Sequence, residues 1–288
     1  MSALILDGRA AAARILDDVR TRAALRAESG KPRPALAVVR VGDDPPSVRY
    51  ARQLERTFHS AGLGVRLEVL PPTTDDDGLA ALLRALSTDA SVHGILLQLP
   101  LPAHLSRERA AEEVAPAKDV DGLNPLNAGR LFLGRGRAFA PATPLGGLEL
   151  LRHYGIGIAG RHAVVVGRSE VLGRPLALLL LRENATVTIC HSRTPDLSRL
   201  TRQAEILAVA VGRPGLVTGD MVAPGAVVLD FGINVVAGQV VGDVDFASVA
   251  PLAGAITPVP GGTGPMTAAV LARNTLTAAE RQDGRAVP

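Results

Sequence analysis

Aromatic side chains are scarce in this sequence of 288 residues, which has five phenylalanines, two tyrosines and no tryptophan. Leucine, alanine and valine must therefore fill its hydrophobic cores. Proteins that hold single-stranded nucleic acid stack the bases on aromatic rings, and the formal net charge of +3 is small for a basic binding face. The composition argues against a nucleic-acid partner.

Cysteine and lysine are also nearly missing. The single Cys190 cannot form a disulfide framework or a cysteine metal site, and the six histidines contain no pair spaced i, i+4. We therefore expect no metal. Only Lys31 and Lys118 are lysines, so almost all of the 31 basic residues are arginines.

Long apolar runs are missing as well. No stretch is long enough to span a bilayer, and the N-terminus lacks the basic start and apolar core of a signal peptide. We expect a cytoplasmic protein with no membrane partner. Its length is sufficient for two domains.

Apolar segments alternate with helical patterns in the first part of the chain, which predicts a parallel sheet with right-handed crossovers. Ligands of such sheets bind beyond the carboxyl ends of the strands. Strands are expected at Leu4–Leu6, Ala35–Val41, Val65–Leu70 and Val92–Gln98, and helices at Arg9–Glu28, Leu79–Leu86, Ser106–Val114 and from a Ser47 cap to about Ala61.

The stretch from Ala163 to Thr194 predicts a strand–loop–helix–strand unit. Gly167 and Gly173 enclose the loop GRSEVLG, in which Ser169 takes the place of the middle glycine of the usual dinucleotide motif. Gly167 permits a sharp turn, and the following helix can offer free N–H groups to a pyrophosphate. The glycines alone would also fit an ordinary turn in an α/β domain.

The second strand of this unit ends in His191, Ser192 and Arg193 rather than in an acidic residue. Aspartate or glutamate there would bind a free ribose hydroxyl. A hydroxyl and a cation, together with Arg168 of the loop, instead suit a 2′-phosphate. The pattern favours NADP over NAD.

Eight motifs in one order carry a resemblance over nearly the whole chain. They are VGDDPPSVRY from Val41, QLPLP from Gln98, KDVDG from Lys118, NPLNAGRL from Asn124, PATPLGG from Pro141, GRSEVLGRP from Gly167, HSRT from His191 and TPVPGGTGPMT from Thr257. Together they resemble the bifunctional methylenetetrahydrofolate dehydrogenase/methenyltetrahydrofolate cyclohydrolase family of the bacterial FolD type.

The resemblance implies two α/β domains with a cleft between them. A folate-binding catalytic domain would comprise residues 1–140 plus 268–288. A Rossmann-like NADP-binding domain with a mostly parallel sheet would comprise residues 141–267. The resemblance also implies a homodimer formed through the nucleotide domain.

Two reactions are implied: NADP-dependent oxidation of 5,10-methylenetetrahydrofolate, and hydrolysis of the methenyl product to 10-formyltetrahydrofolate. Asp121 would bind the pterin ring, and Tyr50 and Gln98 would lie near the one-carbon centre. Ile233 would pack beside the nicotinamide. The remaining substrate-binding positions implied are Leu99, Pro260, Gly261, Gly264 and Thr267.

One departure from the family pattern concerns the second reaction. The family has a catalytic lysine four residues after the tyrosine, and here that position holds Leu54. Leucine cannot exchange a proton, so we expect a dehydrogenase with weak or absent cyclohydrolase activity. Alternatively, both activities survive with water activated by Gln98, Tyr50 or Asp121, or the chain only binds folate and NADP. Leu54 could also simply belong to an apolar stripe of the helix.

Overall fold

The computed structural model describes residues 2–284, which divide into two compact units. The first unit comprises Arg14–Ala142 and the described chain from Ala268 onward. The second unit comprises the described residues up to Ala13 and Thr143–Thr267. The boundaries fall within three helices: α1 (Gly8–Glu28), α6 (Ala142–His153) and α10 (Thr263–Gln282).

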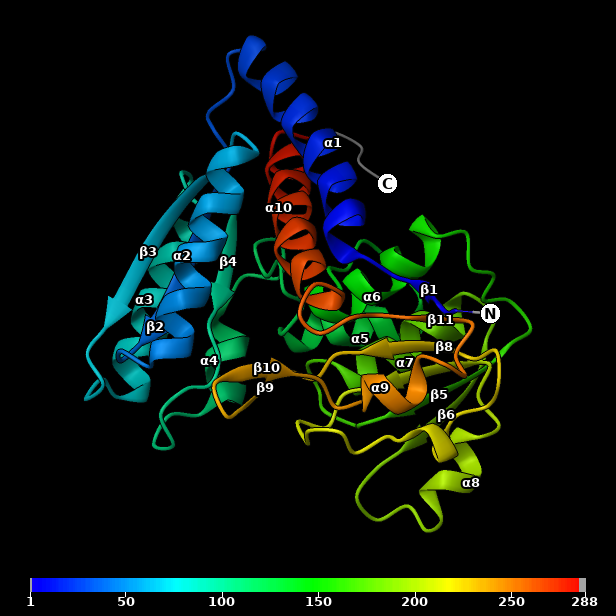
Figure 1. The fold of residues 1–288 in the computed structure, drawn as a ribbon. Coiled ribbons are helices and arrows are strands. Elements are labelled where there is room, and N and C mark those ends of the chain that lie inside the picture. Colours follow the sequence, from blue (N-terminus) through cyan, green and yellow to red (C-terminus); the bar gives the residue numbers. More distant parts are fainter. Residues whose placement is uncertain (1, 285–288) are drawn as a thin grey trace. The chain divides into compact units, whose positions relative to one another are not determined.

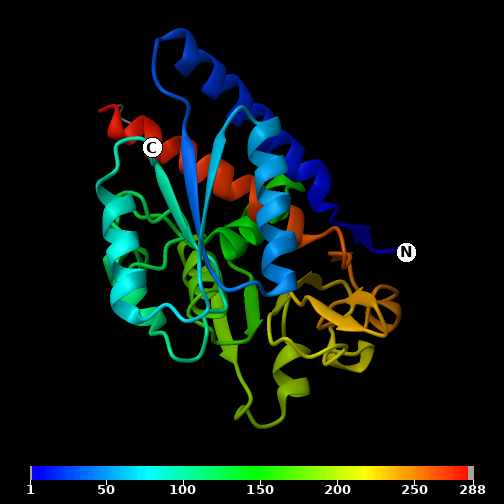
Figure 2. The same ribbon diagram turned by 90° about the vertical axis from the view of Figure 1, so that its left-hand side faces the viewer.

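The first unit is built on a parallel three-stranded sheet in the order β3-β2-β4. Helix α2 covers one face of this sheet and α3 covers the other (Figures 1 and 2). The elements are β2 (Ala35–Val41), α2 (Pro45–Ser60), β3 (Gly64–Leu70), α3 (Asp76–Thr88), β4 (Gly94–Leu97), α4 (Arg107–Glu113) and α5 (Pro125–Leu133).

The core of this unit follows from the alternation of side chains along its strands. Ala37, Val39 and Val41 of β2 pack with Ile95 of β4 against the leucines that α3 presents at helical spacing. The central strand β2 is covered on both faces, which explains its almost continuous apolar sequence.

Helix α2 begins earlier than the sequence suggested, and Ser47 is not its cap. Asp44 caps the helix and accepts a hydrogen bond from the Ser47 backbone N–H at 3.1 Å. Pro45 and Pro46 occupy the first two helical positions, where a missing N–H costs nothing. The proline pair and its preceding aspartate therefore set the start of the helix.

The second unit contains a parallel six-stranded sheet in the order β1-β11-β8-β7-β5-β6. Its elements are β1 (Leu4–Ile5), β5 (His162–Val166), α7 (Gly173–Arg182), β6 (Thr186–Cys190), α8 (Leu197–Thr201), β7 (Ile206–Val209), a 3₁₀ turn (Gly219–Met221), β8 (Val227–Asp230), α9 (Phe246–Val249) and β11 (Ala255–Ile256). A separate antiparallel hairpin joins β9 (Asn234–Val236) to β10 (Gln239–Val241).

The strand order places a switch point in this sheet. After β5 the chain forms β6 on one side of it, and then returns to form β7 on the other side. The loops that follow β5 and β7 therefore leave the same edge of the sheet in opposite directions. Dinucleotides bind in the crevice at such a switch point in doubly wound sheets.

The expected two-domain α/β fold with a mostly parallel second sheet is confirmed, but the N-terminal strand differs. It was expected with the first domain, residues 1–140; instead β1 pairs with β11, and the chain up to Ala13 clusters with the second unit. The segment Pro141–Pro144 suggests a link between the domains from its prolines, but α6 already begins at Ala142. Residue 1 and the last four residues of the predicted 268–288 segment lie outside the described residues.

Within residues 2–284, no helix combines the length and apolar character needed to cross a membrane.

Candidate functional site

The loop after β5 is shaped by close backbone contacts at two glycines. Gly167 has a φ of 130°, and a side chain there would collide with the carbonyl oxygen of Ala210 in the loop after β7. A side chain on Gly173 would collide with the Gly167 carbonyl group. Both glycines are needed to fold this loop back on itself beside the switch point, as expected for a phosphate-binding turn.

The loop leads into α7, whose first turn contains Pro175, where a residue without an N–H is tolerated. The hydroxyl of Ser169 accepts a hydrogen bond from the Gly173 N–H at 3.3 Å, and the Ser169 carbonyl accepts one from the Arg174 N–H at 3.0 Å. Ser169 thus holds the loop against the helix start. The positive end of the α7 dipole favours an anion here.

The turn after β6 holds two of the predicted phosphate ligands. His191 Nδ1 accepts from the Arg193 N–H at 3.1 Å, and the hydroxyl of Thr194 accepts from the His191 N–H at 2.9 Å. These bonds fix the backbone while the side chains of Ser192 and Arg193 stay exposed. Arg168 is also exposed at the end of the neighbouring strand β5. The arrangement suits a 2′-phosphate.

Gln98 follows β4 at the carboxyl edge of the first sheet and is buried. Its Nε2 donates to the Ser47 carbonyl oxygen at 2.7 Å, which ties the strand end to the first turn of α2. The buried Oε1 of Gln98 accepts no hydrogen bond from any described residue. An unsatisfied buried acceptor is costly, and such atoms mark sites where a ligand or water completes the structure.

Asp121 and Tyr50 both have raised pKa values, and the Asp121 carboxylate contributes to that of Tyr50. Burial raises the pKa of Asp121 to about 7, against the opposing effect of the Ala142 N–H, which donates to Oδ1 at 3.0 Å. Burial and then the nearby Asp121 carboxylate raise the pKa of the Tyr50 phenol. Tyr50 therefore remains a protonated donor, while Asp121 changes its charge near neutral pH.

A neighbouring network, which the sequence interpretation missed, orders the chain around Asp121. The buried Asp119 carboxylate accepts from the N–H groups of Leu123 and Asn124 at 2.9 and 2.8 Å. The Asn127 amide donates to the same carboxylate at 2.8 Å. The motifs KDVDG and NPLNAGRL contain these residues, but the sequence alone did not pair them. Asp119 is thus structural, whereas Asp121 has an acceptor oxygen to spare for a ligand.

Leu54 and Phe58 of α2 are fully buried, Ala51 of the same helix is buried, and Ala61 at its C-cap is fully buried. This agrees with the apolar-stripe interpretation of the helix. Lys118 cannot supply the missing amine, because its Nζ donates to the carbonyl oxygens of Leu86 and Asp89 at 3.2 and 2.6 Å.

The glycine- and proline-rich segment that leads into α10 contains the remaining predicted substrate positions except Leu99. Gly261 has a φ of 113° and its carbonyl accepts from the Gly8 N–H at 2.9 Å. The hydroxyl of Thr267 donates to that of Thr143 at 3.2 Å. The peptide bonds before Pro260 and, in the first unit, before Pro100 are cis, with Leu99 half-buried. Gly264 is exposed in the first turn of α10.

Ile233 is 71% exposed just after β8, so its side chain is available to a ligand at the carboxyl edge of the second sheet. Among residues 2–284 no group of three or more histidines, cysteines and acidic residues could hold a metal ion.

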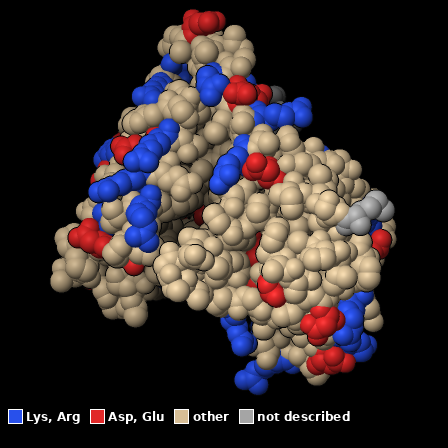
Figure 3. All heavy atoms as spheres, viewed as in Figure 1, with Lys and Arg blue, Asp and Glu red and all other residues tan. Residues whose placement is uncertain are grey.

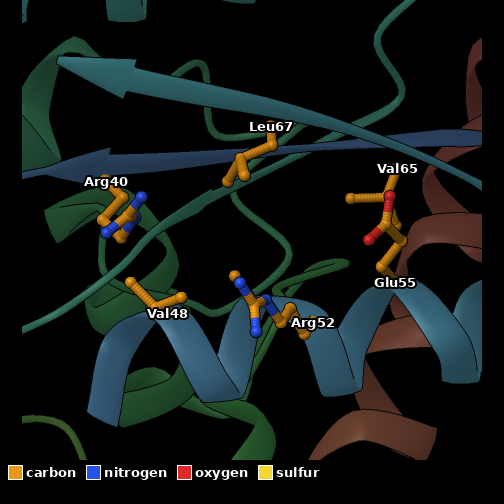
Figure 4. Close-up of a pocket in the computed structure, with 7 residues that line it drawn as sticks. Arg40, Val48, Arg52, Glu55, Val65 and Leu67 are labelled. Atoms are coloured by element: carbon orange, nitrogen blue, oxygen red, sulfur yellow. The ribbon is translucent and has the colours of Figure 1, made fainter. Parts of the chain in front are cut away.

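The first unit also has a cavity of about 180 Å³ between α2 and strands β2 and β3 (Figure 4). It lies on the flank of α2 opposite Tyr50 by helical geometry, and no predicted folate residue lines it. The surface over α2 and β3 is rich in cations (Figure 3), with Arg49, Arg52 and Arg56 exposed on the helix. The lining residues are Arg40, Val48, Ala51, Arg52, Glu55, Val65 and Leu67.

The raised pKa of Asp121 predicts a specific pH dependence of stability. Between about pH 4 and pH 7 the folded protein keeps a proton that the unfolded chain has lost, so stability falls as the pH rises through this window. Asp121→Asn cannot ionise. Its stability relative to wild type should rise over the window by up to about 1.4 kcal/mol per pH unit.

Urea unfolding of both proteins between pH 4.5 and 8 measures this difference. Asp230, whose pKa burial raises to about 6, is present in both proteins and cancels in the comparison. Parallel stability curves would show that Asp121 titrates like an ordinary carboxylate.

The strand order, the glycine loop and the switch point define the second unit as a doubly wound dinucleotide-binding domain. Family models agree with this class. The Tetrahydrofolate dehydrogenase/cyclohydrolase, NAD(P)-binding domain matches residues 141–283, and the catalytic domain of the same name matches residues 6–121. The chain belongs to the tetrahydrofolate dehydrogenase/cyclohydrolase family.

Individual relatives cover almost the entire chain. The "Bifunctional protein FolD" of Chloroflexus aurantiacus is 54% identical over 99% of this chain and 100% of its own length. A crystal structure of the bifunctional FolD enzyme from Campylobacter jejuni is similar with a TM-score of 0.95 and 42% identity, covering 98% of this chain and 100% of that one. The Trypanosoma brucei enzyme, complexed with NADP cofactor and inhibitor, has a TM-score of 0.95, 36% identity and coverages of 99% and 100%.

Proposed function

We propose that this protein oxidises 5,10-methylenetetrahydrofolate with NADP and also hydrolyses the methenyl product to 10-formyltetrahydrofolate. Support for both activities comes from relatives that are 54% and 52% identical to this chain and are named bifunctional. This favours the fully bifunctional alternative over the dehydrogenase with weak or absent hydrolysis that Leu54 suggested. Homodimerisation through the second unit and a cytoplasmic location stay predictions.

The residues at the second sheet's carboxyl edge fit NADP. Gly167 and Gly173 leave no room for side chains, so the loop can turn tightly beside the start of α7, which favours the pyrophosphate. Arg168, Ser192 and Arg193 offer two cations and a hydroxyl to a 2′-phosphate. NADP, when bound, accepts the hydride. The chain's own part is to hold the ring, for which the exposed Ile233 is available.

In the first unit, Asp121 is the proposed ligand of the pterin ring. A carboxylate accepts two hydrogen bonds from an aminopyrimidine edge as a charge-assisted pair. Binding to the ionised form would lower the pKa of Asp121 from its value of about 7. Tyr50 stays protonated because burial and the Asp121 carboxylate raise its pKa, and it would lie against the bound ring system.

The single observation that carries the hydrolytic step is the unsatisfied acceptor of Gln98. We infer that its buried Oε1 accepts a hydrogen bond from the attacking water. An amide orients water but cannot take its proton, so the proton passes to solvent water as the C–O bond forms, and the C–N5 bond then breaks to give the 10-formyl product. Hydrolysis therefore relies on the electrophilic methenyl cation and on positioning, and it is slower than it would be with an amine at position 54.

One assay tests both activities. The protein is incubated with methylenetetrahydrofolate and NADP, and NADPH and the methenyl product are followed together. NADPH formation with methenyl loss faster than its loss without enzyme supports the proposal. Methenyl that accumulates and decays only at the spontaneous rate would leave a dehydrogenase alone, and no NADPH would leave a binding protein.

A double substitution tests the cofactor site. Ser192→Asp with Arg193→Ala removes a hydroxyl and a cation and adds a carboxylate that repels a 2′-phosphate but can accept from a ribose hydroxyl. The ratio of kcat/KM for NADP to that for NAD should fall by at least about 100-fold. Arg182→Ala, on the exposed last turn of α7, is the control. An unchanged ratio would place the 2′-phosphate elsewhere.

A further inference from the structure

The loop after β7 forms half of the switch-point crevice in the second unit. Strand β7 lies next to β5, and the carbonyl oxygen of Ala210 is in close contact with Gly167 of the glycine loop. The backbone of residues 211–213 therefore borders the place where a dinucleotide would lie. The sequence there is Val211-Gly212-Arg213, in which Arg213 has the only polar side chain.

A single fully buried carboxylate holds this loop. Asp243 Oδ2 accepts from the N–H groups of Val211 and Gly212 at 2.6 and 2.9 Å, and Oδ1 accepts from the Arg213 N–H at 2.8 Å. The Asn234 amide donates to Oδ1 at 2.9 Å. Three consecutive backbone N–H groups that converge on one anion form the kind of concavity that binds phosphate in other proteins.

A second buried carboxylate fixes the first. Asp230, at the end of β8, accepts from the Asp243 N–H at 3.0 Å and from the Val244 N–H at 3.0 Å. It also accepts from the Gly232 N–H at 2.8 Å. A side chain on Gly232 would collide with Asp243, and one on Gly242 with Asp230. The segment after β10 is thus tied to the loop after β7 by Asp243 and to the end of β8 by Asp230.

We propose that Asp243 is a positioning residue for the dinucleotide. By filling the concavity of residues 211–213 with the protein's own anion, it fixes that backbone at the crevice and keeps its amides from binding a phosphate. The pyrophosphate is then left to the Gly167–Gly173 loop and the start of α7. This inference rests on the proposed use of NADP, and it assigns Asp243 no contact with the nucleotide.

Asp243→Asn tests the proposal. The amide nitrogen of asparagine would face backbone N–H groups and leave at least one of them without an acceptor, so the loop should loosen. We expect the dissociation constant for NADP, measured by calorimetry, to rise at least about tenfold, with KM for NADP rising in parallel. The kcat value and KM for methylenetetrahydrofolate should change by less than about threefold. Amide exchange should accelerate at residues 211–213 and stay unchanged in β5 and β7.

Asp196→Asn is the matched control, because Asp196 also accepts a backbone N–H, that of Arg199, within the second unit but at the start of α8. It should leave NADP affinity unchanged. If Asp243→Asn does not fold, Asn234→Ala removes one donor to Asp243, and about a threefold rise in the NADP dissociation constant is expected.

If folded Asp243→Asn binds NADP as tightly as wild type, the inference is wrong while the proposed function stands. The same holds for Asn234→Ala if only that variant folds. Faster exchange at residues 211–213 without a loss of affinity overturns it too, because the held loop would then not matter to the nucleotide. A wild-type protein that binds no NADP overturns the proposed function, and this inference with it.

Discussion

Asp121→Ala should abolish the turnover of methylenetetrahydrofolate while the affinity for NADP stays unchanged. Hydrogen bonds to a charged group contribute about 1.5–3 kcal/mol each, so losing this partner should lower kcat/KM for the folate by at least about 100-fold. Asp121 belongs to the first unit, and the glycine loop and the turn after β6 belong to the second. The substitution therefore removes the proposed partner of the folate and leaves the proposed NADP-binding residues intact.

Asp121→Asn separates charge from packing in this experiment. It keeps the oxygen that can accept from the Ala142 N–H, so local structure should survive. It cannot accept from two donors of an aminopyrimidine edge, so folate turnover should remain nearly as low as in Asp121→Ala. Normal folate affinity of either variant in calorimetry would show that the pterin site has been misplaced.

The sequence predicted best those elements that are determined locally. The strands Ala35–Val41 and Thr186–Cys190 occur with the expected bounds, because each is a short β-branched or apolar run that ends at a glycine or polar turn. The residues Val235–Val241, with Gly238 between two β-branched pairs, also predict a hairpin from sequence alone, and the structure confirms it. In these segments the hydrophobic pattern and the turn residues indicate the same structure.

The sequence did not predict which strands pair over long distances in the chain. Leu4–Ile5 is too short to show its partner, and it pairs with Ala255–Ile256 near the other end of the chain. The helix at Pro125–Leu133 was interpreted only as a motif, although Asn124 caps it and a proline starts it. Asp230 and Asp243 passed unnoticed for the same reason, since their roles depend on N–H groups that folding brings to them.

The candidate site divides in the same way. The residue types of Arg168, Ser192 and Arg193 indicated a phosphate from sequence alone, because charge and hydroxyl chemistry do not depend on distant contacts. The unsatisfied oxygen of Gln98 and the raised pKa of Asp121 arise only from burial. The sequence therefore predicted which residue types could bind a ligand. The fold determines which of their polar atoms have no partner in the protein and which carboxylates have a shifted pKa.

Leu54→Lys should raise the hydrolysis of methenyltetrahydrofolate by at least about tenfold, below the usual 10²–10⁴-fold range of acid–base catalysis to allow for imperfect placement. Leu54 lies one turn after Tyr50 on α2 and points back toward the start of the helix, as helical side chains do. Gln98 is bonded to Ser47 in that first turn. A lysine amine could therefore reach the region of the unsatisfied Gln98 oxygen.

The amine would act through a lowered pKa. Leu54 is fully buried, and burial disfavours a charged ammonium, as does a cationic substrate nearby. A partly neutral amine can take the proton that attacking water releases, which Gln98 cannot do. The gain in hydrolysis should accordingly depend on pH, whereas dehydrogenase activity should change by less than about threefold, because hydride transfer depends on positioning.

Leu54→Met is the matched control, since methionine conserves volume and shape without an amine. Methenyl decay is compared for wild type, Leu54→Lys, Leu54→Met and buffer alone, with thermal unfolding measured beside each activity because a buried amine costs stability. Wild type should exceed buffer, Leu54→Met should match wild type, and Leu54→Lys should exceed both. A well-folded Leu54→Lys no faster than Leu54→Met would show that the side chain at position 54 does not reach the reacting carbon, and that this chain hydrolyses its substrate by an arrangement that no longer includes this position of α2.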